Sequence, residues 1–303
     1  MTLKKAVLGI ASFIVLVLVV VVAIPETPVS GRPESAPMRV SVLPDIEPSE
    51  ITARFSPLLD HLSRETGLPM QMVAAENYQD ILRLFAAQEI DLAFFGGLTF
   101  VIANKNFGAE PLVMRDIDTR FTSYFLVSAE GHLRHCQNLR CPDLAGKVFS
   151  FGSQLSTSGH LMPRHFLKSD LQIIPEDYFG TVRHAKTHDQ TALDVLAGRA
   201  DVGVVNGEIY RRIVAEGQIK DGALRIIWET PPYPDYVWAV QEGLSTAEKI
   251  RLRDAFLKLD QIREPDATML DNLGAGAFLP AGIEEYLPLR RIAESLDLMA
   301  GAP

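Results

Sequence analysis

The stretch YQDILRLFAAQEIDLAFFGGLTFVIANKNFG, residues 78–108, decides the expected fold. Apolar residues recur at helical spacing from Tyr78 to Ile90, and residues 91–97 form a short apolar run that ends in two glycines. Helical spacing then returns up to Gly108. A helix, a buried strand and a second helix in this order predict an alternating α/β architecture.

The same alternation continues in both directions along the chain. Upstream, MRVSVLP (38–44) and MQMVAAE (70–76) are predicted strands on either side of a helix at 49–67. Downstream, a second block repeats the order from KVFSFGS (147–153) to ADVGVVNGEIYRRIVAEG (200–217). Repeated β-α-β units predict a mostly parallel sheet with helices on both faces.

Ligands of such sheets bind beyond the carboxyl ends of the strands. The positions that directly follow predicted strands in the first block are Pro44, Tyr78, Phe95, Gly96 and Gly97. We therefore expect a binding site near these residues.

Three consecutive hydroxyl residues, Ser156, Thr157 and Ser158, precede a predicted helix together with Gly159. The first amides of a helix lack internal partners and the helix dipole is positive there, so that end favours an oxyanion. The hydroxyls add neutral donors, and the glycine permits a close approach. An ordinary helix cap, which favours the same residue types, is the alternative interpretation.

The length and the charge limit the function classes. With 303 residues, the chain can form one large domain or two lobes. Its formal net charge of −9 argues against a nucleic-acid binder, because neutralising phosphates requires clustered Lys and Arg. Any bound anion therefore depends on local geometry.

The N-terminus predicts export. Lys4 and Lys5 precede an uncharged apolar run at residues 6–24, which indicates that the body lies outside the cytoplasm. The run is longer than a signal-peptide core of roughly 7–15 residues and close to the ~20 that cross a bilayer. We expect residues 1–37 to form an uncleaved membrane anchor and a linker. A cleaved signal peptide is the alternative.

The two cysteines, Cys136 and Cys141, are close in sequence. In an exported protein such a pair favours a small-loop disulfide. His132 and His135 lie nearby, so a zinc site is the alternative, although the segment is polar and loop-like.

Four segments carry a family resemblance: FGSQLSTSGHLMP, HAKTHDQTALDVLAGRADVGVVN, ENYQDILRLFAAQEIDLAFFGG and PPYPDYVWAV. With these motifs, the body from about residue 38 to 298 resembles the periplasmic substrate-binding proteins of phosphonate ABC transporters and their phosphite and phosphate relatives. A subgroup named for selenate binding resembles the chain more closely still, through FTS, LMPR, TPPYPDY and FLP. A selenate-like ion is therefore a rival ligand.

The resemblance implies a type II periplasmic binding fold, in which two doubly wound α/β lobes are joined by two crossings and clamp a ligand between them. It implies a first lobe at 38–127 and 232–303 and a second lobe at 128–231. The crossings are expected near Leu126–Glu130 and near Glu229–Tyr233.

The resemblance also implies the ligand-binding residues. In the family, consecutive Ser-Thr-Ser hydroxyls and amides hold the phosphonate oxygens, and a histidine and two tyrosines assist. The matching residues here are Ser156, Thr157, Ser158, His188, Tyr78 and Tyr124.

Two carboxylates are candidates for binding an amino group on the ligand. Glu208 and Asp235 match positions that hold the ligand ammonium in aminophosphonate-binding members, whereas the alternative leaves Glu208 in solvent and Asp235 ordering a bend. Asn206 is a neutral candidate at a strand end. Among the aromatic residues, Phe95 and Tyr236 are expected nearest the ligand.

The motifs argue against an enzyme. His188 and Asp189 are adjacent and cannot easily orient one another, and no G-x-S-x-G, Walker, dinucleotide or H-E-x-x-H motif is present. We expect a monomer without cofactor or metal that captures a small tetrahedral oxyanion by lobe closure and docks on an ABC permease. An anchored sensor that feeds a separate signalling partner is the alternative.

Overall fold

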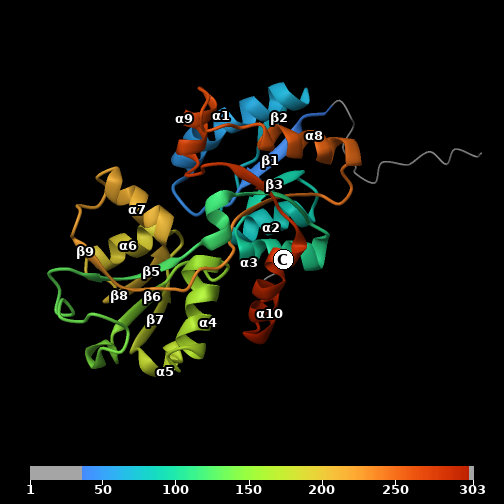
Figure 1. Ribbon diagram of the computed structural model, residues 1–303. Coiled ribbons are helices and arrows are strands. Elements are labelled where there is room, and N and C mark those ends of the chain that lie inside the picture. Colours follow the sequence, from blue (N-terminus) through green and yellow to red (C-terminus); the bar gives the residue numbers. More distant parts are fainter. Residues whose placement is uncertain (1–35, 300–303) are drawn as a thin grey trace, which may run out of the picture.

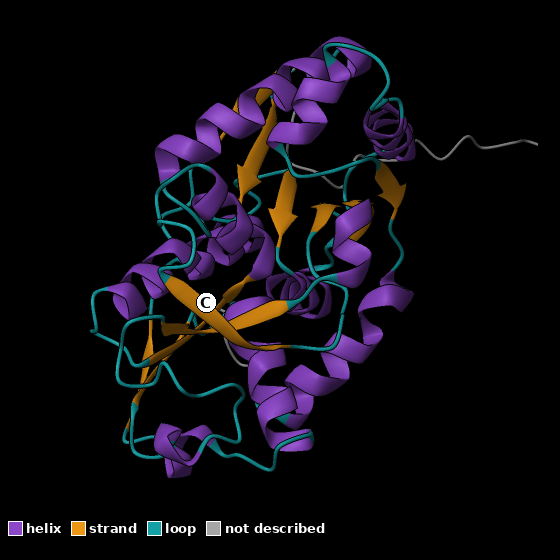
Figure 2. Ribbon diagram, turned by 60° about the vertical axis from the view of Figure 1, so that its left-hand side comes forward, coloured by secondary structure: helices purple, strands orange, loops and turns teal. Residues whose placement is uncertain are grey.

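The computed structural model describes residues 36–299, which form two β-sheets with helices packed around each (Figure 1). Figure 2 shows the strands of the two sheets as two separate groups. The expected anchor at residues 6–24 lies outside the described residues. Between residues 36 and 299, no helix has the length and apolar character needed to span a bilayer.

The first sheet has six strands in the order β11-β4-β10-β3-β1-β2. β1 pairs in parallel with β2 and β3, whereas β10 runs antiparallel to β3 and β4, and β11 runs antiparallel to β4. Its strands are β1 (Met38–Val42), β2 (Met70–Met72), β3 (Leu92–Phe95), β4 (Glu110–Arg115), β10 (Val237–Val240) and β11 (Phe278–Pro280). The helices in these parts of the chain are α1 (Pro48–Thr66), α2 (Tyr78–Ala86), α3 (Gly97–Phe107), α8 (Thr246–Leu257), α9 (Asp266–Asn272), η4 (Ile283–Tyr286) and α10 (Leu287–Ser295).

The second sheet has five strands in the order β7-β6-β8-β5-β9. β6 is parallel to β7 and β8, and β5 is antiparallel to β8 and β9. Its strands are β5 (Ser123–Ser128), β6 (Val148–Phe151), β7 (Thr181–His184), β8 (Val202–Asn206) and β9 (Leu224–Glu229). Its helices are η2 (Pro142–Leu144), the π-helical turn η3 (Thr157–Leu161), α4 (Met162–Ser169), α5 (Pro175–Tyr178), α6 (His188–Leu196) and α7 (Gly207–Ala215).

The chain passes between the sheets twice, first between β4 and β5 through η1 (Asp116–Arg120), and again between β9 and β10. The two passages touch, because the backbones of Phe121 and Tyr233 exchange two hydrogen bonds of 2.8 and 3.0 Å. The first crossing was expected near Leu126–Glu130, but β5 already pairs within the second sheet. An apolar strand does not reveal in its own sequence which sheet it will join.

The expected strand at the centre of residues 78–108 is confirmed, since all four residues of β3 are buried. Both faces of this strand are covered, which explains its continuous apolar run instead of an alternating one. The edge strand β7 is largely exposed by contrast.

The expected disulfide is confirmed, because Cys136 and Cys141 are bonded to each other in the loop between β5 and β6. His135 lies beside this pair in a spacing that suits a metal ion. The zinc alternative is wrong, because sulfurs joined in a disulfide are not available as thiolate ligands.

Candidate functional site

The N-termini of three helices lie close together: α2 and α3 belong to the half of the molecule with the first sheet, and α6 to the half with the second. The backbone N–H of Leu98, in the first turn of α3, donates to Thr157 Oγ1 over 2.9 Å. The Tyr78 hydroxyl, at the start of α2, lies near Ser156, and His188 at the start of α6 approaches the same serine. Because helix N-termini carry partial positive charge, their convergence favours an anion without a full countercharge.

The Ser-Thr-Ser segment (residues 156–158) is buried between the sheets. The exposed fractions of the three residues are 3, 2 and 1%. Ser156 Oγ caps η3 by accepting from Gly159 N over 2.9 Å, and the Ser158 carbonyl accepts from Ser123 Oγ over 2.7 Å. The groups of α2 and α3 that cover the segment belong to the opposite sheet, so its burial comes from contact between the two halves of the molecule. Ser158 Oγ is buried without a hydrogen-bond partner.

His188 is a neutral donor at this site. Its Nδ1 accepts from the backbone N–H of Asn206 over 3.1 Å, which leaves the proton on Nε2. Nε2 lies 3.4 Å from Ser156 Oγ. Burial lowers the pKa of His188 to about 3, with a further contribution from the nearby positive charge of Arg212. The imidazole therefore offers a hydrogen bond but no charge.

Asp235 supplies the carboxyl group of the site. Its Oδ1 accepts from Gly97 N over 3.0 Å, while Oδ2 is buried without a partner. Burial raises the pKa of Asp235 to about 7, and hydrogen bonds from Gly97 and Thr157 oppose this shift. The carboxyl group can therefore exchange a proton with a ligand near neutral pH. We call Tyr78, the Ser-Thr-Ser segment, His188 and Asp235 the buried cluster.

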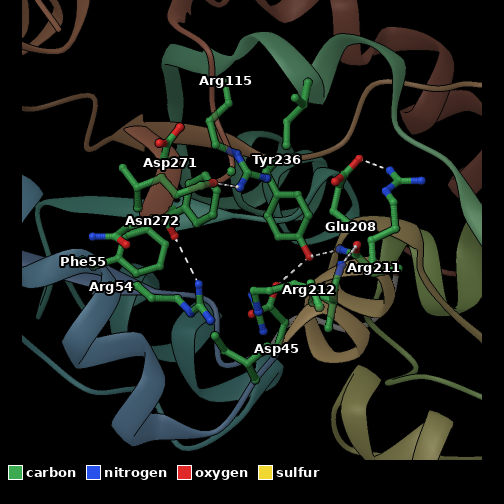
Figure 3. Close-up of a pocket in the computed structure, with 18 of the residues that line it drawn as sticks. Asp45, Arg54, Phe55, Arg115, Glu208, Arg211, Arg212, Tyr236, Asp271 and Asn272 are labelled. Atoms are coloured by element: carbon green, nitrogen blue, oxygen red, sulfur yellow. Dashed lines mark hydrogen bonds and ion pairs between the residues drawn. The ribbon is translucent and has the colours of Figure 1, made fainter. Parts of the chain in front are cut away.

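A cavity of about 570 Å³ lies next to the buried cluster and is shown in Figure 3. Tyr236, Asn206 and Asp45 line it, and their side chains are linked: Asn206 Nδ2 donates to the Tyr236 hydroxyl over 3.0 Å, and that hydroxyl donates to Asp45 Oδ2 over 2.6 Å. Asp45 also accepts at its backbone carbonyl from His188 N over 3.3 Å. These three residues therefore connect the cavity wall to the buried cluster.

Each arginine that the structure places around this cavity has a carboxylate partner. Arg115 pairs with Asp118 through two bonds of 2.7 and 2.8 Å, and Arg211 pairs with Glu208. The remaining ion pairs are Arg54–Glu216 at 2.5 Å, Arg54–Glu50 at 3.6 Å, Arg212–Glu50 at 3.5 Å and Arg212–Glu216 at 3.7 Å. We call this space the arginine cavity.

Not every expected residue lies at the buried cluster. The Phe95 ring packs edge-on against Phe85 in the core, and its neighbour Phe94 lines the cavity, because successive strand residues point to opposite faces. Tyr124 packs against Tyr210 on α7.

The two expected amine ligands, Glu208 and Asp235, lie in different surroundings. Glu208 lines the arginine cavity and is paired with Arg211, whereas Asp235 belongs to the buried cluster. Burial raises the pKa of Glu208 as well. Gly96 does lie at the cluster, since a Cβ there would come within 3.5 Å of Thr157 Oγ1 and 3.6 Å of Asp235 Oδ1.

Sequence reasoning missed two side chains. Asp45 follows the strand-end residue Pro44, so the strand-end rule came within one position of it. Arg115 lies over the rings of Phe94 and Tyr236, with its guanidinium 5.2 Å from each centroid. No local sequence pattern predicts that Arg115 is buried and paired with Asp118.

The sequence matches one family model over residues 40–286, that of ABC transporter, phosphonate, periplasmic substrate-binding proteins. The chain belongs to this family. The expected extracytoplasmic location of the folded body agrees with that membership, and its members bind solutes.

Curated relatives and solved structures agree with the family assignment. The probable ABC transporter phosphite binding protein PhnD1 of Prochlorococcus marinus (strain MIT 9301) is 27% identical over 278 residues, which cover 90% of this chain and 93% of the relative. The phosphate-import protein PhnD of Mycolicibacterium smegmatis is 26% identical over 294 residues, covering 89% and 88%.

Solved structures confirm the expected type II periplasmic binding fold. The structure of the Prochlorococcus PhnD1 in complex with methylphosphonate gives a TM-score of 0.79 at 26% identity and covers 86% of this chain and 98% of that one. A binding protein component of an ABC phosphonate transporter from Pseudomonas aeruginosa gives 0.78 at 20% identity, covering 88% of each chain. At that lower identity the likeness concerns the fold alone.

Proposed function

We propose that this binding protein captures a small tetrahedral phosphorus oxyanion in the buried cluster and delivers it to an ABC permease. The relatives are named for phosphite and phosphate, and one is solved with methylphosphonate. These three ions are the ligands that we expect for this chain.

One observation carries the proposal: Ser158 Oγ and Asp235 Oδ2 are both buried without partners. Such groups cost free energy unless a ligand satisfies them. The serine hydroxyl can donate to an oxyanion oxygen, and the Asp235 carboxylate can accept from a P–OH group. A phosphorus oxyanion that keeps one proton satisfies both atoms. Above its pKa of about 7, Asp235 is ionised and can only accept, so fully ionised selenate, which offers no proton, is disfavoured there. At lower pH the protonated carboxyl group can donate to either kind of ion, so the ligands are compared at pH 8.

Closure of the two halves follows from the contacts between them. Leu98–Thr157, Tyr78–Ser156 and Tyr236–Asn206 each join a residue of the first sheet's half to one of the second. A ligand favours this arrangement only through contacts that a separated arrangement lacks. Ligands of the buried cluster touch both halves, so binding stabilises the closed form.

The proposal is tested by titration calorimetry of the purified chain with phosphite, phosphate, methylphosphonate, 2-aminoethylphosphonate and selenate. We expect at least one of the first three to bind, and selenate to bind at least about tenfold more weakly. If selenate is the tightest ligand, the assigned role of Asp235 is wrong. If none of the first three binds, the proposed function is wrong.

We also propose that residues 6–24 stay uncleaved and hold the chain at the inner membrane, as a monomer. The apolar length of that run supports the anchor. N-terminal sequencing of the membrane-bound protein checks it, because a mature N-terminus inside residues 25–37 would indicate a cleaved signal peptide. Light scattering of the detergent-solubilised chain measures the oligomeric state. Membrane fractions that hold a kinase partner instead of a permease would favour a sensor.

A further inference from the structure

Three side chains form the boundary between the buried cluster and the arginine cavity. Asp45, Tyr236 and Asn206 line the cavity, whereas the Ser-Thr-Ser segment and Asp235 do not. Behind the boundary, Asn206 N and the Asp45 carbonyl both bond to His188, which in turn approaches Ser156. Asp45, Tyr236 and Asn206 therefore lie between the proposed oxyanion site and a cavity of about 570 Å³. We call these three residues the partition.

The partition is held rigidly on each side. Asn206 Oδ1 caps α7 by accepting from Ile209 N over 2.9 Å, which directs its Nδ2 toward Tyr236. The Tyr236 ring stacks on Phe94 with centroids 5.1 Å apart and an interplanar angle of 17°. Arg115 covers the same ring at 5.2 Å. The phenol cannot rotate away without losing this stacking and both of its hydrogen bonds.

The partition also crosses between the two halves of the molecule. Asn206 ends β8 of the second sheet, while Asp45 follows β1 and Tyr236 precedes β10 of the first. Figure 3 shows Tyr236 at the edge of the cavity, with its hydroxyl directed toward Asp45. The Tyr236–Asn206 bond therefore forms only when the halves are closed. Any ligand atom in its place opposes closure.

We propose that the partition sets an upper limit on ligand size, so that the site accepts phosphorus oxyanions with no substituent or a methyl group and discriminates against phosphonates with three or more carbons. The proposal rests on the proposed function and narrows its ligand class. The cavity described beside the cluster is the arginine cavity, and a longer substituent that extends into it must displace the Tyr236 hydroxyl. Asn206 Nδ2 and Asp45 Oδ2 would then be left unpaired in a buried position, which is unfavourable.

The test compares two ligands, methylphosphonate and n-propylphosphonate, by titration calorimetry on the full chain. Wild type is expected to prefer methylphosphonate by at least about tenfold. Tyr236→Leu removes the ring and opens the passage to the cavity, so the preference should fall to about threefold or less. The ratio of the two affinities is the readout, because a general loss of closure weakens both ligands alike.

Two further variants keep the test decisive. Tyr236→Phe retains the ring and removes only the hydroxyl bonds, so its preference for methylphosphonate should be smaller than that of wild type, and this result can be measured even if the leucine variant does not fold. Tyr210→Leu is the matched control: Tyr210 is a buried tyrosine on α7 outside the cavity wall, and its preference should equal that of wild type.

The outcomes separate the two proposals. Equal affinity of wild type for both phosphonates, or an unchanged ratio in both Tyr236 variants, overturns the size limit while leaving the proposed function intact. If wild type binds none of phosphite, phosphate and methylphosphonate, the proposed function fails and the size limit fails with it.

Discussion

The buried cluster and the arginine cavity lie on opposite sides of Tyr236 and handle charge in opposite ways. In the cluster, backbone amides donate hydrogen bonds to hydroxyls, to the neutral imidazole of His188 and to the carboxyl group of Asp235. In the cavity, guanidinium groups are common, and each lies within 4 Å of a carboxylate, although Arg212 Nε and Nη2 make no hydrogen bond. If the proposed oxyanion site is correct, the difference teaches that positive charge near a cleft does not by itself mark such a site.

The physical reason lies in burial. An unpaired guanidinium placed among fully buried groups has a large desolvation cost, whereas burying amide and hydroxyl dipoles at helix ends costs much less. The cavity arginines serve another purpose, since Arg54 and Glu50 on α1 meet Arg212 on α7 and Glu216 just beyond it. This group of ion pairs joins the two halves of the molecule at the cleft edge.

The largest expected effect comes from the cluster side. Ser158→Ala should weaken methylphosphonate binding about 10- to 100-fold, because a hydrogen bond to a charged group contributes about 1.5–3 kcal/mol. The unliganded protein should be as stable as wild type or slightly more stable, since the hydroxyl it loses has no partner. Calorimetric titration and thermal unfolding measure the two effects.

Ser150→Ala is the control, because Ser150 is buried in β6 of the same sheet and its hydroxyl bonds to a backbone carbonyl. Its ligand affinity should stay within about twofold of wild type. Unchanged affinity in Ser158→Ala would mean that Ser158 does not contact the ligand, and the cluster would no longer be distinguished from the cavity as the oxyanion site.

Asp235→Asn tests the charge state of the cluster. The pKa of Asp235 is raised to about 7 in the folded protein, against about 3.9 when unfolded. The folded state therefore resists ionisation, and its stability falls as pH rises from about 4 through 7. Wild type should lose about 1–3 kcal/mol of unfolding free energy relative to Asp235→Asn between pH 5 and 8. Urea unfolding of the ligand-free proteins measures this, and parallel pH profiles would contradict a raised pKa.

Arg54→Gln tests the cavity side. The variant loses the Arg54–Glu216 ion pair, which joins α1 to the other half of the molecule. The affinity for every ligand should therefore fall equally, by about two- to fivefold, because half-exposed ion pairs contribute up to about 1 kcal/mol. The effect should shrink in high salt. Arg253→Gln, on the exposed face of α8, is the control and should bind as wild type. A loss of methylphosphonate binding comparable to that of Ser158→Ala would mean that a cavity arginine holds the oxyanion.

Glu208→Gln should have the smallest effect. Because Glu208 is paired with Arg211 on a partly exposed wall of the cavity, the ratio of 2-aminoethylphosphonate to methylphosphonate affinity should change by less than about twofold. Titrating both ligands against both proteins gives this ratio. A tenfold loss of affinity for 2-aminoethylphosphonate alone would indicate that Glu208 binds the ligand amine, so that the ligand would contact the cavity as well as the cluster.

Local patterns predicted the parts of the site that depend on short stretches of chain. The helix start after Ser156–Ser158 follows from hydroxyl and glycine preferences, and the strand-end rule located Tyr78, Gly96 and Gly97. These features need only neighbouring residues to specify them. Phe95 shows the limit, because its adjacent position Phe94 is equally aromatic and the pleat of the strand decides which ring meets the cleft.

The sequence by itself determined the α/β order, the disulfide pair and the oxyanion-favouring turn, because each depends on spacing within one segment. Only the tertiary structure decided that β5 belongs to the second sheet, that Asp45 bonds to Tyr236 from 191 positions away, and that the arginines are neutralised in a separate cavity. The reason is physical: burial and charge pairing depend on which distant groups come into contact. Those contacts exist only in the folded chain.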